Sequence, residues 1–168
     1  MSLSDAERVI INSLQRRGFN IRKLGERLYT ASKELKPIGI KRRHIFCVIL
    51  FTDKKIDIDI VKEIHKLFEK KKPVSWRTFF FYNIIFVTTK GYTDEAMNFI
   101  RRKLMGAFNI RPIMIWDILS TSFTKITHII DLSSRTIIYP YPYEELQTLI
   151  HREIRELIDE VTTSISRL

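Results

Sequence analysis

The run RRHIFCVILF, residues 42–51, is the clearest structural signal in this chain. From Ile45 to Phe51 every side chain is apolar, so no alternation between a buried and a solvated face is visible. Strands that are covered on both faces, as in parallel sheets flanked by helices, have this continuous apolar pattern. We therefore predict a strand at the centre of a sheet.

The segments that follow this strand alternate between helix and strand signals. Residues 57–72 predict a helix with acidic side chains at its start, lysines at its end and Pro73 beyond it. TFFFYNIIFVTT, residues 78–89, predicts a second buried strand, Thr93 caps a further helix, and IRPIMIW, residues 110–116, predicts another strand. This alternation is typical of an α/β fold with a parallel or mixed sheet covered by helices.

The two flanks complete one domain. SDAE, which begins at Ser4, predicts a capping box with Glu7 at the start of a helix that Gly18 ends, and residues 19–24 predict a strand. Residues 25–43 predict a short helix and then a turn at residues 37–39. Residues 127–132 and 135–140 predict a short edge hairpin, and residues 143–161 an amphipathic tail helix. We expect a single domain, 1–168, with a core at 1–120 and the hairpin and tail helix at 121–168.

The charge is strongly basic and unevenly distributed. The chain has a net charge of +10 and a pI of about 9.8. Residues 1–55 carry 13 Lys/Arg against 5 Asp/Glu, whereas residues 136–168 carry 3 against 6. Such a field attracts polyanions, and we expect DNA as the partner. The candidate phosphate contacts are the clustered cations of the basic half: Arg16, Arg17, Arg22, Lys23, Lys41, Arg42 and Arg43.

The sequence lacks the signature motifs of several classes of protein. There is no phosphate-binding glycine loop. The four histidines do not have zinc-ligand spacing, and each is expected to lie at the surface or at its boundary. Cys47 is the only cysteine and lies in an apolar run, which fits a buried side chain in a reducing, cytoplasmic setting. The sequence has neither a signal-peptide layout nor an apolar run long enough to span a bilayer. Scarce glutamine beside abundant Ile, Lys and Arg is a thermophilic trait.

Two stretches resemble known nucleases. SDAERVIINSLQRRGFNI, residues 4–21, resembles the first helix and strand of archaeal Holliday-junction resolvases. NIIFVTTKGYTDEAMNFIRR, residues 83–102, followed by IRPIMIWDIL, residues 110–119, resembles the second half of Mrr-type restriction nucleases. Both families share the restriction-endonuclease-like, PD-(D/E)xK fold, so the resemblance, over residues 4–120, implies a mixed sheet flanked by helices and an archaeal source.

The active site that this resemblance implies is degenerate. Such nucleases need an Asp and a Glu-x-Lys on neighbouring strands to hold a divalent metal ion. In this chain the Glu-x-Lys slot falls at Val48, Ile49 and Leu50, and the Asp slot falls at Pro37 and Ile38. Apolar side chains offer no metal ligands, so the resemblance predicts that catalysis is lost. The alternative is a Mg²⁺ site built from residues near these slots: Glu7, Glu34, Asp53 and Lys55.

The sequence thus leaves three hypotheses. The first is a nuclease-derived nucleic-acid-binding protein without metal catalysis or cofactor, acting as a DNA-processing accessory or as a subunit of a complex. The second is an active metal-dependent DNA endonuclease, and the third is a non-catalytic protein-interaction subunit. The tail helix is expected either to cover the core or to contact a second copy or a protein partner, because the resembled resolvases act as dimers.

Overall fold

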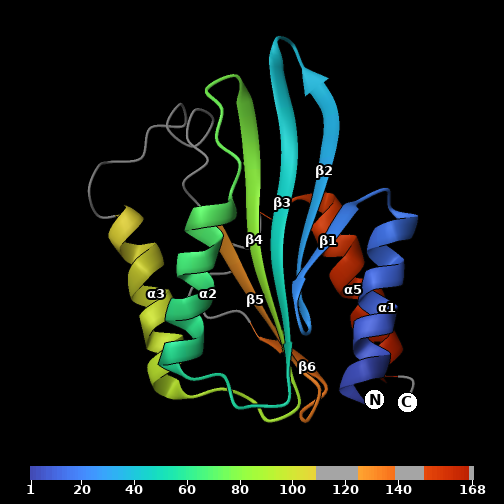
Figure 1. Ribbon diagram of the computed structural model, residues 1–168, viewed down its shortest axis with the longest axis vertical. Coiled ribbons are helices and arrows are strands. Elements are labelled where there is room, and N and C mark those ends of the chain that lie inside the picture. The colour runs from blue at the N-terminus through green and yellow to red at the C-terminus, as the bar shows by residue number, and fades with distance from the viewer. Residues whose placement is uncertain (109–124, 139–149, 167–168) are drawn as a thin grey trace.

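The computed structural model describes residues 1–108, 125–138 and 150–166. A six-stranded sheet lies between two helical layers, with α1 and α5 on one face and α2 and α3 on the other (Figure 1). The elements in chain order are α1 (Leu3–Arg16), β1 (Asn20–Gly25), β2 (Leu28–Ile38), β3 (Lys41–Thr52), α2 (Ile58–Lys71), β4 (Thr78–Thr88), α3 (Asp94–Phe108), β5 (Lys125–Asp131), β6 (Thr136–Ile138) and α5 (Arg152–Ser166). The α/β class is as predicted.

The sheet is mixed, and its strands lie side by side in chain order. β1, β2 and β3 form an antiparallel meander, β3, β4 and β5 are parallel, and β6 returns antiparallel to β5. Each parallel step needs a long crossover, and α2 makes the one between β3 and β4. Within the described residues no helix is long and apolar enough to cross a bilayer.

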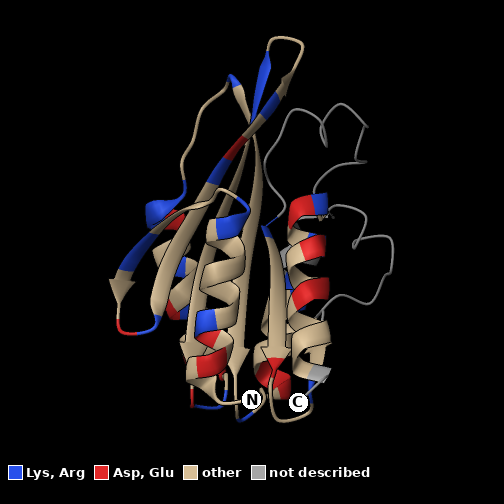
Figure 2. Ribbon diagram, turned by 90° about the vertical axis from the view of Figure 1, so that its right-hand side faces the viewer, with Lys and Arg blue, Asp and Glu red and all other residues tan. Residues whose placement is uncertain are grey.

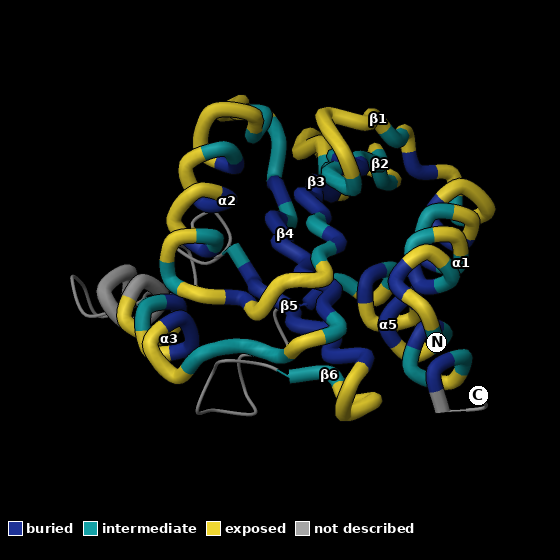
Figure 3. Tube along the Cα trace, turned by 60° about the horizontal axis from the view of Figure 1, so that its bottom comes forward, coloured by how far each residue is buried: buried dark blue, intermediate teal, exposed yellow. Residues whose placement is uncertain are grey.

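β3 is buried on both faces, which explains its continuous apolar run. Ile45, Cys47 and Ile49 pack into the core beneath α1 and α5. Phe46 and Val48 alternate with them and pack beneath α2 and α3. Figure 3 shows this buried centre of the sheet, with exposed residues concentrated on the outer sides of the helices and in the loops. The predicted central strand is therefore confirmed, and Cys47 is fully buried.

α1 begins two residues earlier than predicted. Ser2, not Ser4, is the N-cap, and its hydroxyl accepts a hydrogen bond from the Asp5 amide at 3.1 Å. The sequence repeats the same spacing, with Ser2 three residues before Asp5 and Ser4 three residues before Glu7. Glu7 is therefore not needed for the cap, and its carboxylate accepts a hydrogen bond from the Tyr29 hydroxyl instead.

The short helix predicted within residues 25–43 is wrong. This segment forms β2, which pairs along its length with β3, and only the turn near Gly39 is as predicted. Helix-forming residues such as Ala31, Lys33 and Glu34 occupy a strand here because pairing with a central strand outweighs local propensity.

The C-terminal part differs from prediction in two ways. β5 and β6 do form a hairpin, but β5 pairs in parallel with β4, so only β6 lies at the edge. The tail helix begins at Arg152, because Ile150 and His151 are not helical. The predicted strand at 110–116 and the start of the predicted tail helix at 143–149 lie outside the described residues.

Candidate nucleic-acid interface

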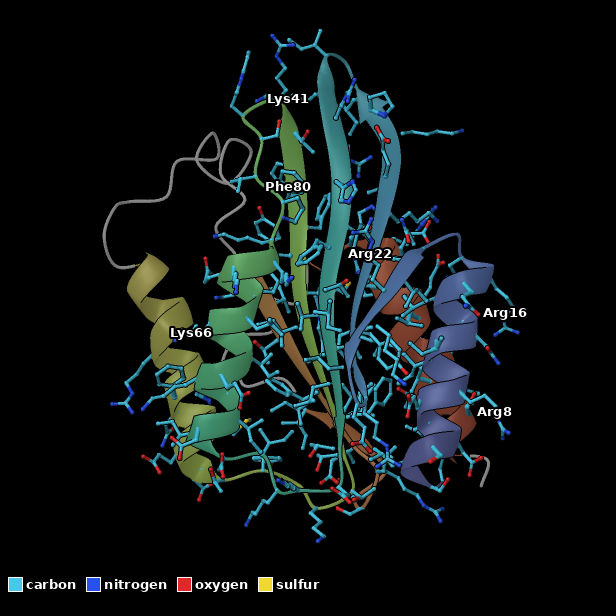
Figure 4. All side chains as sticks on the ribbon, in the orientation of Figure 1. Arg8, Arg16, Arg22, Lys41, Lys66 and Phe80 are labelled. Carbon is cyan, nitrogen blue, oxygen red and sulfur yellow. The ribbon has the colours of Figure 1, made fainter. Side chains whose placement is uncertain are left out.

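The structure divides the seven predicted phosphate contacts among three places. Arg16 and Arg17 lie at the end of α1, Arg22 and Lys23 lie on the edge strand β1, and the remaining three begin β3. Figure 4 shows Lys41 at one end of the sheet and Arg16 and Arg22 further down, on the side of α1. These cations therefore do not form one continuous surface.

Arg16 and Arg17 connect α1 to α5. Arg16 pairs with Glu160, and Arg17 lies 2.9 Å from Glu156 and 3.1 Å from Glu160. Glu160 also accepts a hydrogen bond from Ser13 at 2.6 Å. That bond is the main cause that lowers the pKa of Glu160, and Arg17 and Arg16 add to it, so the carboxylate stays charged near neutral pH. Much of the charge on these two arginines is thus balanced within the chain.

The cations of β3 lie at the end of the sheet where the β2–β3 hairpin extends beyond the helices (Figure 1). Lys41 and Arg42 are exposed, and Arg43 is half-buried. The Arg43 guanidinium packs over the Phe81 ring and lies 3.3 Å from Nε2 of His151. Burial, together with the charge of Arg43, lowers the pKa of His151, whose Nδ1 accepts a hydrogen bond from the Glu153 amide at 3.2 Å. Arg43 is therefore partly structural, whereas Lys41 and Arg42 are exposed to solvent.

A second segment brings further cations to the same end. The loop between α2 and β4 lies against the hairpin: the Arg42 amide donates to the Arg77 carbonyl at 3.1 Å, and Lys41 Nζ donates to the Trp76 carbonyl at 3.2 Å. Together, residues 36–43 and 70–77 hold eight Lys/Arg and no Asp/Glu. We call these two segments the basic tip. Its cations are Lys36, Lys41, Arg42, Arg43, Lys70, Lys71, Lys72 and Arg77.

The sequence showed each half of the basic tip but not their contact. The lysines at residues 70–72 also fit the end of a helix, where they favour the helix dipole. Lys36 and Arg77 have no neighbouring cation in the sequence. The missing signal is the parallel register that pairs Arg42 with Thr78, because nothing local links residues so far apart in sequence. Figure 2 shows blue Lys and Arg segments at this end and red Asp and Glu bands along α5. Lys72 is paired with Glu69, at 2.6 Å.

The slot of the resembled nuclease site is occupied by uncharged side chains. Ile49 pairs with Tyr29 across β2 and β3, and both lie in the core beneath α1. Val48 faces the opposite core, and Leu50 packs against it. The Tyr29 hydroxyl donates to Glu7, and this hydrogen bond is the main cause that raises the pKa of Tyr29 to about 12. Glu7 also lies 3.7 Å from Arg27.

The four alternative catalytic residues are not brought together. Glu34 pairs with His44 near the hairpin end, whereas Asp53 and Lys55 follow the other end of β3. Asp53 lies nine positions after His44, which corresponds to about 30 Å of extended strand. Ligands of one divalent ion lie within about 2–2.6 Å of it, so Glu34 and Asp53 cannot share a metal ion in this arrangement. Across the part of the chain that the structure describes, no cluster of three or more His, Cys, Asp or Glu could hold one.

Ligands of α/β proteins commonly bind at the carboxyl ends of the parallel strands. In this chain, polar side chains at those ends form hydrogen bonds within the protein. Thr88 Oγ1 donates to the Lys54 carbonyl at 3.0 Å and accepts from the Lys90 amide at 3.1 Å. Asp131 accepts from Ser133 and Ser134, and these bonds outweigh the effect of burial and lower its pKa. These polar groups stabilise turns.

The histidines differ from expectation in their burial. Each was predicted to lie at the surface or at its boundary, and His44 and His151 are half-buried. His65 and His128 are instead buried, and His128 Nε2 lies 2.9 Å from Oδ1 of Asn83 on the neighbouring strand. Burial lowers the pKa of His128 to about 3, so this imidazole is neutral in the folded protein.

The fold and the basic tip thus define an α/β protein with a mixed sheet and one strongly cationic end. No family model matches the sequence, and no curated protein matches it. One solved structure, described as "Crystal Structure of Protein of Unknown Function AF1548", is similar with 14% identity over 99% of this chain and 100% of that chain. Its TM-score is 0.29.

Proposed function

We propose that this chain is a nucleic-acid-binding protein with a restriction-endonuclease-like fold that has lost metal catalysis. On this proposal it grips the DNA backbone with the basic tip and serves as a DNA-processing accessory or a subunit of a complex. The mixed sheet flanked by helices on both faces supports the fold part of this proposal. The uncharged slot at Ile49 supports the loss of catalysis.

The observation that carries the proposal is the charge of the basic tip. Eight Lys and Arg residues lie in two segments that contain no Asp or Glu, at the end of the sheet where the β2–β3 hairpin extends beyond the described helices. A surface ordinarily mixes charges of both signs, because like charges repel one another. Backbone phosphates are regularly spaced anions that offset this repulsion and release counterions when bound. Such a site would bind backbone phosphates regardless of the DNA sequence.

The test is the salt dependence of duplex DNA binding. The tip variant carries Lys36→Ala, Lys41→Ala and Arg42→Ala, three exposed cations of the hairpin. Each phosphate contact contributes about 0.9 to the slope of log affinity against log salt, so we expect the slope to fall by about 2–3 units. Fluorescence anisotropy with a labelled duplex, over a series of salt concentrations, measures it.

A matched control removes the same charge from the opposite end of the sheet. Lys54→Ala, Lys55→Ala and Lys90→Ala change three exposed lysines that follow β3 and β4. We expect this control to lower overall affinity slightly, through the weaker global field, and to leave the slope nearly unchanged. Equal slopes for wild type and the tip variant would show that the basic tip does not contact phosphates.

A further inference from the structure

Four large apolar side chains are exposed within the basic tip. Ile38 is 66% exposed, Ile40 97%, Val74 81% and Trp76 80%. Among the described residues only one other large apolar side chain, Leu24 at 37%, is classed as exposed. The exposed apolar residues of this chain therefore concentrate on the same two loops as its unbalanced cations. None of these four apolar side chains belongs to either of the two cores.

The two loops hold each other in place. Gly39 has a φ of 59° and permits the tight turn between β2 and β3 that presents Ile38 and Ile40. In the other loop, the Arg77 amide donates to the Ser75 hydroxyl and the Thr78 amide to the Ser75 carbonyl, both at 3.3 Å. The bonds of Lys41 and Arg42 to the second loop join them. Trp76 is thus presented by a hydrogen-bonded framework at the end of the sheet.

One cation already lies over the Trp76 ring. The Arg77 guanidinium carbon lies 4.6 Å from the ring centroid, which places a flat cation over the ring. With 80% of the residue still exposed, the ring can take another flat group. A nucleobase is such a group, and base–aromatic stacking of this kind is what single-strand-binding proteins combine with a cationic groove.

Resting on the proposed function, we infer that the basic tip takes nucleic acid with unpaired bases: a base stacks on Trp76 while neighbouring phosphates contact the surrounding cations. Bases inside a duplex are stacked on one another and offer no free face, so only single strands, ends and branch points fit both features. Ile38, Ile40 and Val74 then contact sugars and base edges, as apolar wedges do at unstacked steps.

The experiment compares Trp76→Ala, Trp76→Phe and wild type. The probes are an oligonucleotide of about 20 deoxythymidines, longer than most single-strand site sizes, and a duplex of the same length. We expect Trp76→Ala to weaken single-strand binding by about 5- to 100-fold, with Trp76→Phe in between. Duplex binding and its salt slope should change less than about twofold, because the cations remain.

A direct readout follows from the tryptophan content. The chain has two tryptophans, so Trp116→Phe leaves Trp76 as the single indole reporter. We expect the oligonucleotide to quench this fluorescence by stacking, and the duplex to quench it much less. Circular dichroism should show the same folded state for each variant and for wild type, so that differences in binding can be compared.

The possible results separate the two proposals. If Trp76→Ala binds single strands as tightly as wild type, the stacking inference is wrong, while salt-dependent duplex binding would still support the proposed function. If wild type binds neither DNA but shifts its Trp76 emission to the blue on vesicles rich in phosphatidylserine, both are wrong and the tip contacts membranes.

Discussion

At the scale of single residues, His128 shows how far burial changes a side chain. It lies fully buried on β5, where Nε2 reaches Asn83 on β4. Its pKa of about 3 lies well below the ordinary value of 6.5, and burial is the cause. Between pH 3 and pH 6.5, His128 is therefore protonated in the unfolded chain and neutral in the folded chain. Stability is full above pH 6.5 and declines as the pH falls toward 3.

The prediction from this residue is a pH-dependent stability difference. A shift of one pKa unit corresponds to about 1.4 kcal/mol, so the His128 contribution at pH 5 costs wild type about 2 kcal/mol relative to pH 7. We expect His128→Gln, which keeps an amide near Asn83 but does not titrate, to lose less stability over this range. Urea unfolding at both pH values measures the difference. Parallel losses in wild type and variant would mean that His128 titrates normally.

Several single residues could not be assigned from the sequence. Two overlapping cap patterns, Ser2 with Asp5 and Ser4 with Glu7, are equally good, and only the structure selects the first. Glu7 then contacts Tyr29, a residue 22 positions away on a strand that the sequence did not predict. The side chains of the central strand were predictable, because seven apolar residues in succession leave no other placement.

At the scale of elements, α5 completes one of the two cores. Ile154, Leu157 and Val161 are almost fully buried among residues of α1 and β3. The outer side of α5 carries Glu156 and Glu160, which bind Arg17. The expectation that the tail helix covers the core is thus met by these contacts. A contact of α5 with a second copy or another protein would have to use its charged outer side, and it remains a prediction.

The energetic prediction concerns one side chain of this helix. Leu157 is 1% exposed, and its truncation leaves a cavity under α1. We expect Leu157→Ala to lower the free energy of unfolding by about 2–5 kcal/mol. The control is Asp159→Ala, an exposed position on the same helix, which should change it by less than about 0.5 kcal/mol. Similar effects of both substitutions, measured by chemical unfolding, would argue against the packing of α5 on the core.

Elements with a strong period or an unbroken apolar run were predictable, and elements set by pairing were not. α2, β3, β4 and the Thr93 cap of α3 agree with the sequence pattern, and the Ala96 amide donates to Thr93 as expected. β2 was missed because its buried positions include the small Ala31 among charged residues. β5 was placed at the edge because its parallel partner is a distant strand.

At the scale of the whole molecule, the carboxylates are distributed so that no metal site forms within the described residues. We expect neither Mg²⁺ nor Mn²⁺ to support cleavage of duplex, single-stranded or four-way-junction DNA. Either ion should also stabilise the fold little, because stabilisation requires a bound ion. Gel assays and thermal melting measure both. Metal-dependent cutting that disappears in Asp53→Ala would restore the endonuclease hypothesis.

The basic tip is also a property of the whole molecule. Its composition was visible in the sequence as two separate clusters, but the site exists only because β3 and β4 are parallel and in a register that aligns Arg42 with Thr78. The charge counts led to the expectation of a polyanionic partner, which stays a prediction. They could not predict that Arg16 and Arg17 would be balanced by α5, since Glu160 lies 144 positions from Arg16 in the sequence.

The packing of α1 on α5 has a consequence for synthesis. A hydrogen bond from Ser13 to Glu160 joins residues 147 positions apart, and the core between these helices needs both. At about 5–20 residues per second, a ribosome takes on the order of ten seconds to pass from one to the other. During that interval α5, which covers α1 and one face of the sheet, has not yet been synthesised. We therefore expect the nascent chain to expose apolar surface that chaperones can bind until residues 152–166 leave the exit tunnel.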